Sequence, residues 1–314
     1  FAFLNMLQLI GWTSIMIYDA MLALQELAPL SPMIWTIAIG ALVILWLFIG
    51  LHNTGYIQAI VSVLLLGLTL YMGAHMILQW PTEASLLTSG NMSFIAALEL
   101  SIAMPLSWLP LISDYTRESK KPFSASLTSA TVYTITSIVM YTLGLSAAIF
   151  GGGDSIITIM MNAGLGLAGL IVIIFSTVTT TFMDAYSAGV SSTTIYNGAS
   201  SKGIAVIVTL VGTIAAILYP MDDITDFLYL IGSVFAPMIA ILLADYFINR
   251  QQVQTLSAYL VRGLIWAVSV GLYHYMLHSE STIGATLPAF TMAFIVTAIV
   301  GFISKTAHIS TEIK

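Results

Sequence analysis

Long apolar stretches alternate with short polar links along the whole chain, and this alternation constrains the fold more than any other feature. A bilayer core about 30 Å thick is crossed by roughly 20 residues of helix. Ten stretches of the 314-residue sequence are close to that length, near 1–25, 33–51, 56–80, 92–116, 122–150, 163–195, 203–220, 224–248, 259–277 and 283–304. The sequence therefore predicts an all-α integral membrane protein with ten spans.

The composition excludes several other classes of protein. Hydrophobic residues make up 59% of the chain and charged residues 7%, whereas a soluble domain carries about 25% charged residues. So few charges cannot cover a soluble globule of this size, and the lipid bilayer is the expected surrounding. The sequence has no basic patch of the kind that nucleic acid requires, so nucleic acid is not an expected partner. It also has no cysteine, which excludes thiolate metal ligands.

The distribution of charge predicts an orientation in the membrane. All eight basic residues follow even-numbered spans or the link after span eight: Arg117, Lys120, Lys121, Lys202, Arg250, Arg262, Lys305 and Lys314. The charged residues in the opposite links are all Asp or Glu. Because Lys and Arg concentrate on the cytoplasmic side, we expect a multi-pass protein of the cell (inner) membrane with a cytoplasmic C-terminus. The chain begins inside an apolar run, so we also expect it to be part of a longer protein.

Span six contains one carboxylate in a run of hydroxyls, "FSTVTTTFMDAYSAGVSS", residues 175–192. Its polar residues follow helical spacing, so that one face is polar: Ser176, Thr180, Asp184, Ser187 and Ser191. The hydroxyls are explained by bonds to their own helix or to a neighbour. A charge in a span costs about 2.5–3.5 kcal/mol and usually faces a cavity or a partner. Asp184 is therefore a candidate functional residue.

Span four, "NMSFIAALELSIAMPLSWLPLISDYTR", contains Glu99 and two prolines. Proline removes a helical hydrogen bond and crowds the preceding turn, so Pro105 and Pro110 predict an interruption between about Met104 and Pro110. A simple proline kink is the alternative. Irregular backbone at this depth lines cavities or is buried in protein, and broken helices build the midplane sites of secondary transporters. Trp108 lies within the predicted interruption.

Four segments together resemble the nucleobase:cation symporter-1 family: "NMLQLIGWTS", "MPLSWLPLISDYTR", "STVTTT" and "APMIAILLADYFINR". The detail of "SWLPLISDYTR" is similar to the hydroxymethylpyrimidine transporter branch. The resemblance covers the whole chain. It implies the twelve-helix inverted-repeat fold typified by LeuT, with residues 1–314 forming one transporter domain that matches helices three to twelve. It also implies cation-coupled uptake of a small nitrogen heterocycle, a hydroxymethylpyrimidine or a nucleobase such as cytosine, by alternating access.

The resemblance further implies roles for individual residues. Trp12 and Trp108 would sandwich the substrate ring, and stacking of this kind is worth about 1–3 kcal/mol per ring. The remaining substrate-binding candidates are Ser107, Thr181, Asp184 and Glu99. The candidate cation ligands are the hydroxyls of Ser176, Thr177, Thr179 and Thr180, with Na+ and H+ both open as the coupling ion and no other cofactor expected. Met16 replaces a glutamine of a characterised branch, and Thr181 and Asp184 replace asparagines that are common in the family.

Two acidic residues lie beside basic ones at cytoplasmic helix ends, Asp114 with Arg117 and Asp245 with Arg250. We interpret them as interfacial ion pairs or as a gate latch. A membrane-embedded enzyme is disfavoured because we interpret the sequence as having no Gly-x-Ser-x-Gly motif and no His-x-x-x-His pair among its five histidines. The functional alternatives are an amino-acid/cation symporter of the same fold and a passive channel for polar solutes.

Overall fold

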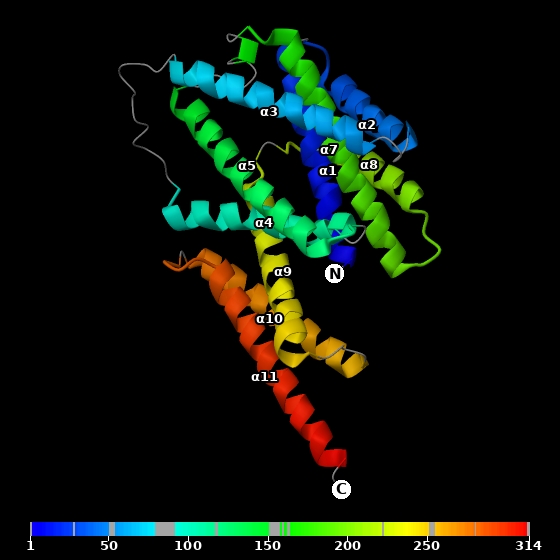
Figure 1. Cartoon of the computed structure of the whole chain (residues 1–314), viewed down its shortest axis with the longest axis vertical. Helices are drawn as coiled ribbons and strands as arrows, with labels where there is room; N and C mark the ends of the chain where they lie inside the picture. Colours follow the sequence, from blue (N-terminus) through cyan, green and yellow to red (C-terminus); the bar gives the residue numbers. More distant parts are fainter. Residues whose placement is uncertain are drawn as a thin grey trace. The chain divides into compact units, whose positions relative to one another are not determined.

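The computed structural model describes residues 2–27, 29–49, 54–78, 92–116, 119–150, 158, 160–161, 164–221, 223–250, 255–279 and 281–312. All regular structure within these ranges is helical (Figure 1). The helices are α1 (Ala2–Leu27), α2 (Pro32–Ile49), α3 (Thr54–Leu78), α4 (Phe94–Thr116), α5 (Pro122–Phe150), α7 (Gly166–Ile195), α8 (Ser201–Leu218), α9 (Thr225–Leu243), η1 (Ala244–Asn249), α10 (Leu256–His278) and α11 (Thr286–Glu312). Ten helical segments among the described residues are long and apolar enough to cross a membrane. The prediction of an all-α, ten-span membrane protein is confirmed.

The predicted interruption of span four is wrong. α4 is one helix that contains both Pro105 and Pro110 and continues through Trp108. Each proline removes only its own N–H donor, and the turns on either side keep theirs. Membrane helices tolerate proline, and the carbonyls that lose a helical donor here are only those of Ser101 and Leu106, four residues before each proline. The two prolines therefore give no evidence for a midplane break.

Contacts between residues divide the chain into two compact units. The first comprises Phe1–Ser89 and Leu111–Asp223, and the second comprises Gly90–Pro110 and Ile224–Lys314. The first unit thus contains α1, α2, α3, α5, α7 and α8, and the second contains most of α4 together with α9, η1, α10 and α11. Each unit has its own apolar core.

Four helices form the centre of the first unit. Every pair among α1, α2, α7 and α8 is in contact, and α3 joins them through α7 (Figure 1). Their shared core is built from one apolar stripe of each helix: Ile17, Ala20, Ala23 and Leu24 of α1, Ile39 of α2, Leu170 of α7 and Ala216 of α8. Small residues let the backbones approach closely, which is the usual way that membrane helices pack. At Gly189 a Cβ atom would overlap the Ser201 carbonyl oxygen at the start of α8.

The second unit is held by contacts of α11 with α9, η1 and α10. Its core contains Ala240 and Ile241 of α9, Ile265 of α10 and Ala293 of α11. Trp266 packs against this core and donates its indole N–H to the Val234 carbonyl oxygen of α9 at 2.9 Å. These contacts tie the three C-terminal spans together.

We expect Gly189→Ala to destabilise the first unit. The added methyl group would overlap backbone of α8 instead of a flexible side chain, and such overpacking costs about 1–3 kcal/mol. Thermal unfolding of the detergent-solubilised protein measures the loss. Gly144→Ala in α5 is the matched control, because nothing lies within 4 Å of its added Cβ. Equal unfolding temperatures for the two variants would show that the α7–α8 approach is not tight.

Candidate functional site

A buried polar contact between Asn5 and Ser191 sets how α1 and α7 pair. Asn5 Nδ2 donates to Ser191 Oγ at 2.8 Å, and Gln8 Nε2 donates to Asn5 Oδ1 at 2.8 Å. All three side chains are buried. Towards the other end of α1, Leu24 shares a core cluster with Leu170 near the start of α7. The two helices therefore run antiparallel, and their polar ends meet.

This register places Trp12 and Asp184 at the same depth. Trp12 follows Asn5 by seven residues, and Asp184 precedes Ser191 by seven. In antiparallel helices both steps run in the same direction, for about 10 Å. Seven residues are also close to two helical turns. Trp12 therefore lies on the same face of α1 as Asn5, and Asp184 lies on the same face of α7 as Ser191. The α1–α7 pair thus brings a predicted stacking residue and a predicted substrate carboxylate to one level.

Asp184 is buried, with 7% of its surface exposed. It has no hydrogen-bond or ion-pair partner among the residues that the structure describes. Its neighbours on the buried side of α7 are the hydroxyl residues Thr181 and Ser187. The Asp184 carboxylate is therefore packed inside the first unit, and it does not lie on a lipid-facing surface.

The hydroxyls predicted to hold a cation lie one to two turns before Asp184. Thr179 is buried and donates to the Ser176 carbonyl at 3.1 Å, and Thr181 donates to the Thr177 carbonyl at 2.7 Å. A hydroxyl that donates to its own helix keeps its lone pairs for a cation. Thr180, which is half-buried, lies on the face of Asp184 one turn away. The run can supply hard oxygen ligands, and its use as a sodium site stays a prediction.

The other predicted substrate residues lie in α4, within the second unit. Ser107 is buried and Trp108 is half-buried. Both belong to the regular helix and not to an unwound segment. The sandwich of Trp12 and Trp108 around a ring stays a prediction.

Glu99 makes a set of contacts that the sequence does not reveal. Its carboxylate accepts hydrogen bonds from the Ala285 N–H at 3.1 Å, from the Thr286 N–H at 3.0 Å and from the Thr286 hydroxyl, all at the start of α11. The Tyr273 hydroxyl of α10 donates to it at 3.4 Å. Gly284, with φ +76°, leaves room for this carboxylate where a Cβ would meet Glu99 Oε1. A carboxylate is favourable at a helix N-terminus, so the geometry favours an anchoring role for Glu99.

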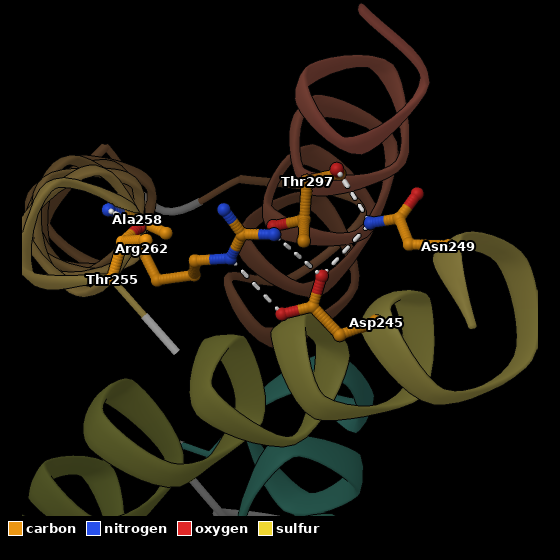
Figure 2. A network of polar contacts seen from close by, with 6 residues as sticks. All are labelled: Asp245, Asn249, Thr255, Ala258, Arg262 and Thr297. Atoms are coloured by element: carbon orange, nitrogen blue, oxygen red, sulfur yellow. Dashed lines mark hydrogen bonds and ion pairs between the residues drawn. The ribbon is translucent and has the colours of Figure 1, made fainter. Parts of the chain in front are cut away.

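A second carboxylate network closes the other end of this unit (Figure 2). Asp245 accepts from Arg262 Nη2 at 2.9 Å and from Arg262 Nε at 3.1 Å, which makes a bidentate pair between η1 and α10. Asn249 Nδ2 bridges Asp245 and the Thr297 carbonyl of α11. The sequence interpretation pairs Asp245 with Arg250, and this is wrong because Arg262, one helix further on, is the partner. The side chains of Asp114 and Arg117 lie outside the described residues.

The interpretation that the sequence has no His-x-x-x-His pair is wrong. His274 and His278 are four residues apart on α10, so they share a helical face, and their spacing in the sequence could have shown this. They line a cavity of about 490 Å³ together with Asp226, Tyr229, Leu230 and Leu277. Across the described ranges no group of three or more His, Asp or Glu side chains is placed to hold a metal ion.

Comparisons with known proteins agree with the resemblance seen in the sequence. Residues 3–313 match the family described as "Permease for cytosine/purines, uracil, thiamine, allantoin". Cytosine permeases of Escherichia coli strains K12 and O157:H7 are each 25% identical to the chain over 185 residues, which is 58% of this chain and 44% of the permease. The match thus spans less than half the length of these curated relatives.

A solved structure gives the fold. The nucleobase-cation-symport-1 family transporter Mhp1, in a closed conformation with bromovinylhydantoin bound, superposes with a TM-score of 0.74 at 17% identity, covering 97% of this chain and 76% of Mhp1. The fold and the buried polar face of α7 define a multi-pass membrane protein with the LeuT-like transporter architecture. The chain belongs to the cytosine/purine permease family, the nucleobase:cation symporters, which are transporters and not enzymes.

We expect Glu99→Gln to lower the stability of the second unit. The glutamine side chain carries no negative charge at the start of α11. Its NH2 group would also face main-chain N–H groups, which are donors too. Hydrogen bonds to charged groups are worth about 1.5–3 kcal/mol, and thermal unfolding in detergent measures the change. Asp226→Asn, at the exposed start of α9, is the control and should cost about 0.3–1 kcal/mol. Unchanged stability with weakened substrate binding would instead make Glu99 a substrate ligand.

Proposed function

We propose that the protein is a secondary active transporter that takes up a small nitrogen heterocycle together with a cation by alternating access. The observation that carries the proposal is the family match across residues 3–313. The buried α1–α7 seam supports it, because polar groups inside a membrane protein mark substrate and ion pathways. Hydroxymethylpyrimidine and nucleobases such as cytosine are the proposed substrates.

The proposed binding site combines a stacking platform with polar groups that read the edge of the ring. Trp12 and Trp108 would hold the ring, since every flat heterocycle offers a π face. Thr181 and Asp184 of α7 and Ser107 of α4 would contact its polar edge. Glu99 would have a positioning role: it would fix α4 against the start of α11, because its oxygens already accept hydrogen bonds from four donor groups.

The proposed orientation follows the charges. Counted along the sequence, the basic residues fall after even-numbered spans or beside the link after span eight, and basic residues concentrate on the cytoplasmic side. We therefore propose that the C-terminus is cytoplasmic and that the protein is in the cell membrane. A cysteine placed after α11 and tested with a membrane-impermeant thiol reagent on intact cells would report the side directly, since the chain has no native cysteine.

Replacing Trp108 with Ala should weaken substrate binding by about 1–3 kcal/mol if stacking dominates. Uptake of radiolabelled cytosine and hydroxymethylpyrimidine by cells expressing the full-length protein measures the effect through KM. Trp46→Ala is the control, because Trp46 lies on α2 outside the proposed site. Unchanged uptake kinetics in Trp108→Ala would reject the sandwich.

Competition and saturation separate this function from its alternatives. Inhibition of uptake by amino acids, and not by pyrimidines, would identify an amino-acid symporter of the same fold. Uptake that neither saturates nor depends on any ion gradient would identify a passive channel.

Replacing Thr180 with Val should weaken sodium binding if the hydroxyl run of α7 holds the coupling ion. The change removes one hard oxygen ligand and leaves the shape of the side chain nearly constant. The concentration of sodium that gives half-maximal uptake should rise severalfold, with little change in maximal rate at saturating sodium. Thr131→Val on α5 is the control, because its exposed hydroxyl only bonds its own helix. If uptake by the wild-type protein does not change with the sodium concentration, the result favours proton coupling.

A further inference from the structure

Asp184 lacks the partners that a buried carboxylate needs. It is 7% exposed, and no described residue donates a hydrogen bond to it or pairs with it. Burying an ionised carboxylate without compensation costs far more than burying a neutral polar group. A positive charge or a set of hydrogen-bond donors from outside the described residues must therefore reach Asp184 when it is ionised.

The hydroxyls one turn before Asp184 do not supply those donors. Thr181 donates to the Thr177 carbonyl at 2.7 Å, and Thr179 donates to the Ser176 carbonyl at 3.1 Å. A hydroxyl has a single hydrogen, so these two groups offer only lone pairs to anything else. These two hydroxyls therefore give no hydrogen to the carboxylate, and a ligand that brings N–H donors would complement it.

The position of Asp184 favours an aromatic ligand as the source of the donors. The antiparallel register set by Asn5 and Ser191 puts Asp184 level with Trp12. A ring stacked on the Trp12 face therefore lies at the depth of the carboxylate, and one edge of the ring can meet it. Two parallel N–H···O bonds from a planar cation are the strongest arrangement for a carboxylate.

We infer that Asp184 selects an amino-substituted nitrogen heterocycle and binds it with its ring protonated. An amino group beside a protonated ring nitrogen presents two N–H donors, as an amidinium does, and these match the two carboxylate oxygens. A heterocycle with an oxo group at that position keeps a single ring N–H donor, and its carbonyl oxygen faces the second carboxylate oxygen, where an acceptor is repelled. This inference rests on the proposed function, because it names which heterocycles the site accepts.

Cytosine and uracil test the inference on the wild-type protein. The two rings differ at the amino or oxo position and at the adjacent ring nitrogen. Competition with a radiolabelled substrate for the full-length protein in membranes gives both affinities. We expect cytosine to bind about ten- to a hundredfold more tightly, the fold-change that corresponds to hydrogen bonds with a charged group.

Asp184→Asn tests the role of the charge. The asparagine amide has one donor group and one acceptor, so it can pair with the amino edge of cytosine or with the oxo edge of uracil. The ratio of the two affinities should therefore fall to a value between one and a few. Asp19→Asn makes the same change at an exposed carboxylate of α1 and should keep the wild-type preference. The ratio of affinities is the readout, because a merely structural loss would weaken both ligands alike.

The outcomes separate the inference from the proposed function. Equal binding of cytosine and uracil by the wild type would overturn the inference, since the carboxyl would then carry the proton itself, and transport of heterocycles would still stand. A cytosine preference that survives Asp184→Asn would likewise overturn it. Should the variant fail to fold, the wild-type ratio alone decides. Binding of neither ring, nor of any other heterocycle, would overturn the proposed function as well.

Discussion

The absence of hydrogen-bond partners in lipid is the constraint on which the rest of this structure depends. Within the hydrocarbon core every main-chain group must be bonded inside its own helix, and every polar side chain must find a partner in the protein. The described hydroxyls of the spans mostly bond carbonyls three or four residues earlier, as Thr13 and Thr209 do. Against this background a polar group that bonds another helix marks a structural joint, and a buried carboxylate without a described partner is a candidate contact for a ligand.

Sequence reasoning succeeded where a single local rule decides the outcome. Length and hydropathy gave the ten spans because a helix in lipid needs nothing else. It failed at α4, where the rule that proline breaks helices was overridden by the intact turns around Pro105 and Pro110. It could not find the partner of Glu99, because the start of α11 lies 186 residues further along the chain. Arg250 lies closer to Asp245 in the sequence than Arg262 does, and proximity in the sequence does not decide which residues pair in space.

The candidate site was partly predictable for a similar reason. Asp184 was evident as a charge at mid-span, and Trp12 followed from a family motif. That the two share one depth depends on the Asn5–Ser191 contact, which joins residues 186 positions apart. The register of two helices is set by tertiary packing, and helical periodicity within each one carries no information about it. The same limit applies to Trp108, whose place relative to Trp12 no local pattern can give.

The network of Figure 2 is built on a helix with an unusual pitch. η1 is a π-helix of six residues, Ala244–Asn249, that continues α9 without a break. A π turn holds one more residue than an α turn, so it acts as a one-residue insertion, and such bulges are frequent at functional sites. The extra residue rotates everything after it by about 100° relative to an unbroken α-helix. The extra residue of the π turn therefore brings Asn249 towards α11. Deleting one residue from η1 would turn Asn249 away from α11 without changing any side chain in the network.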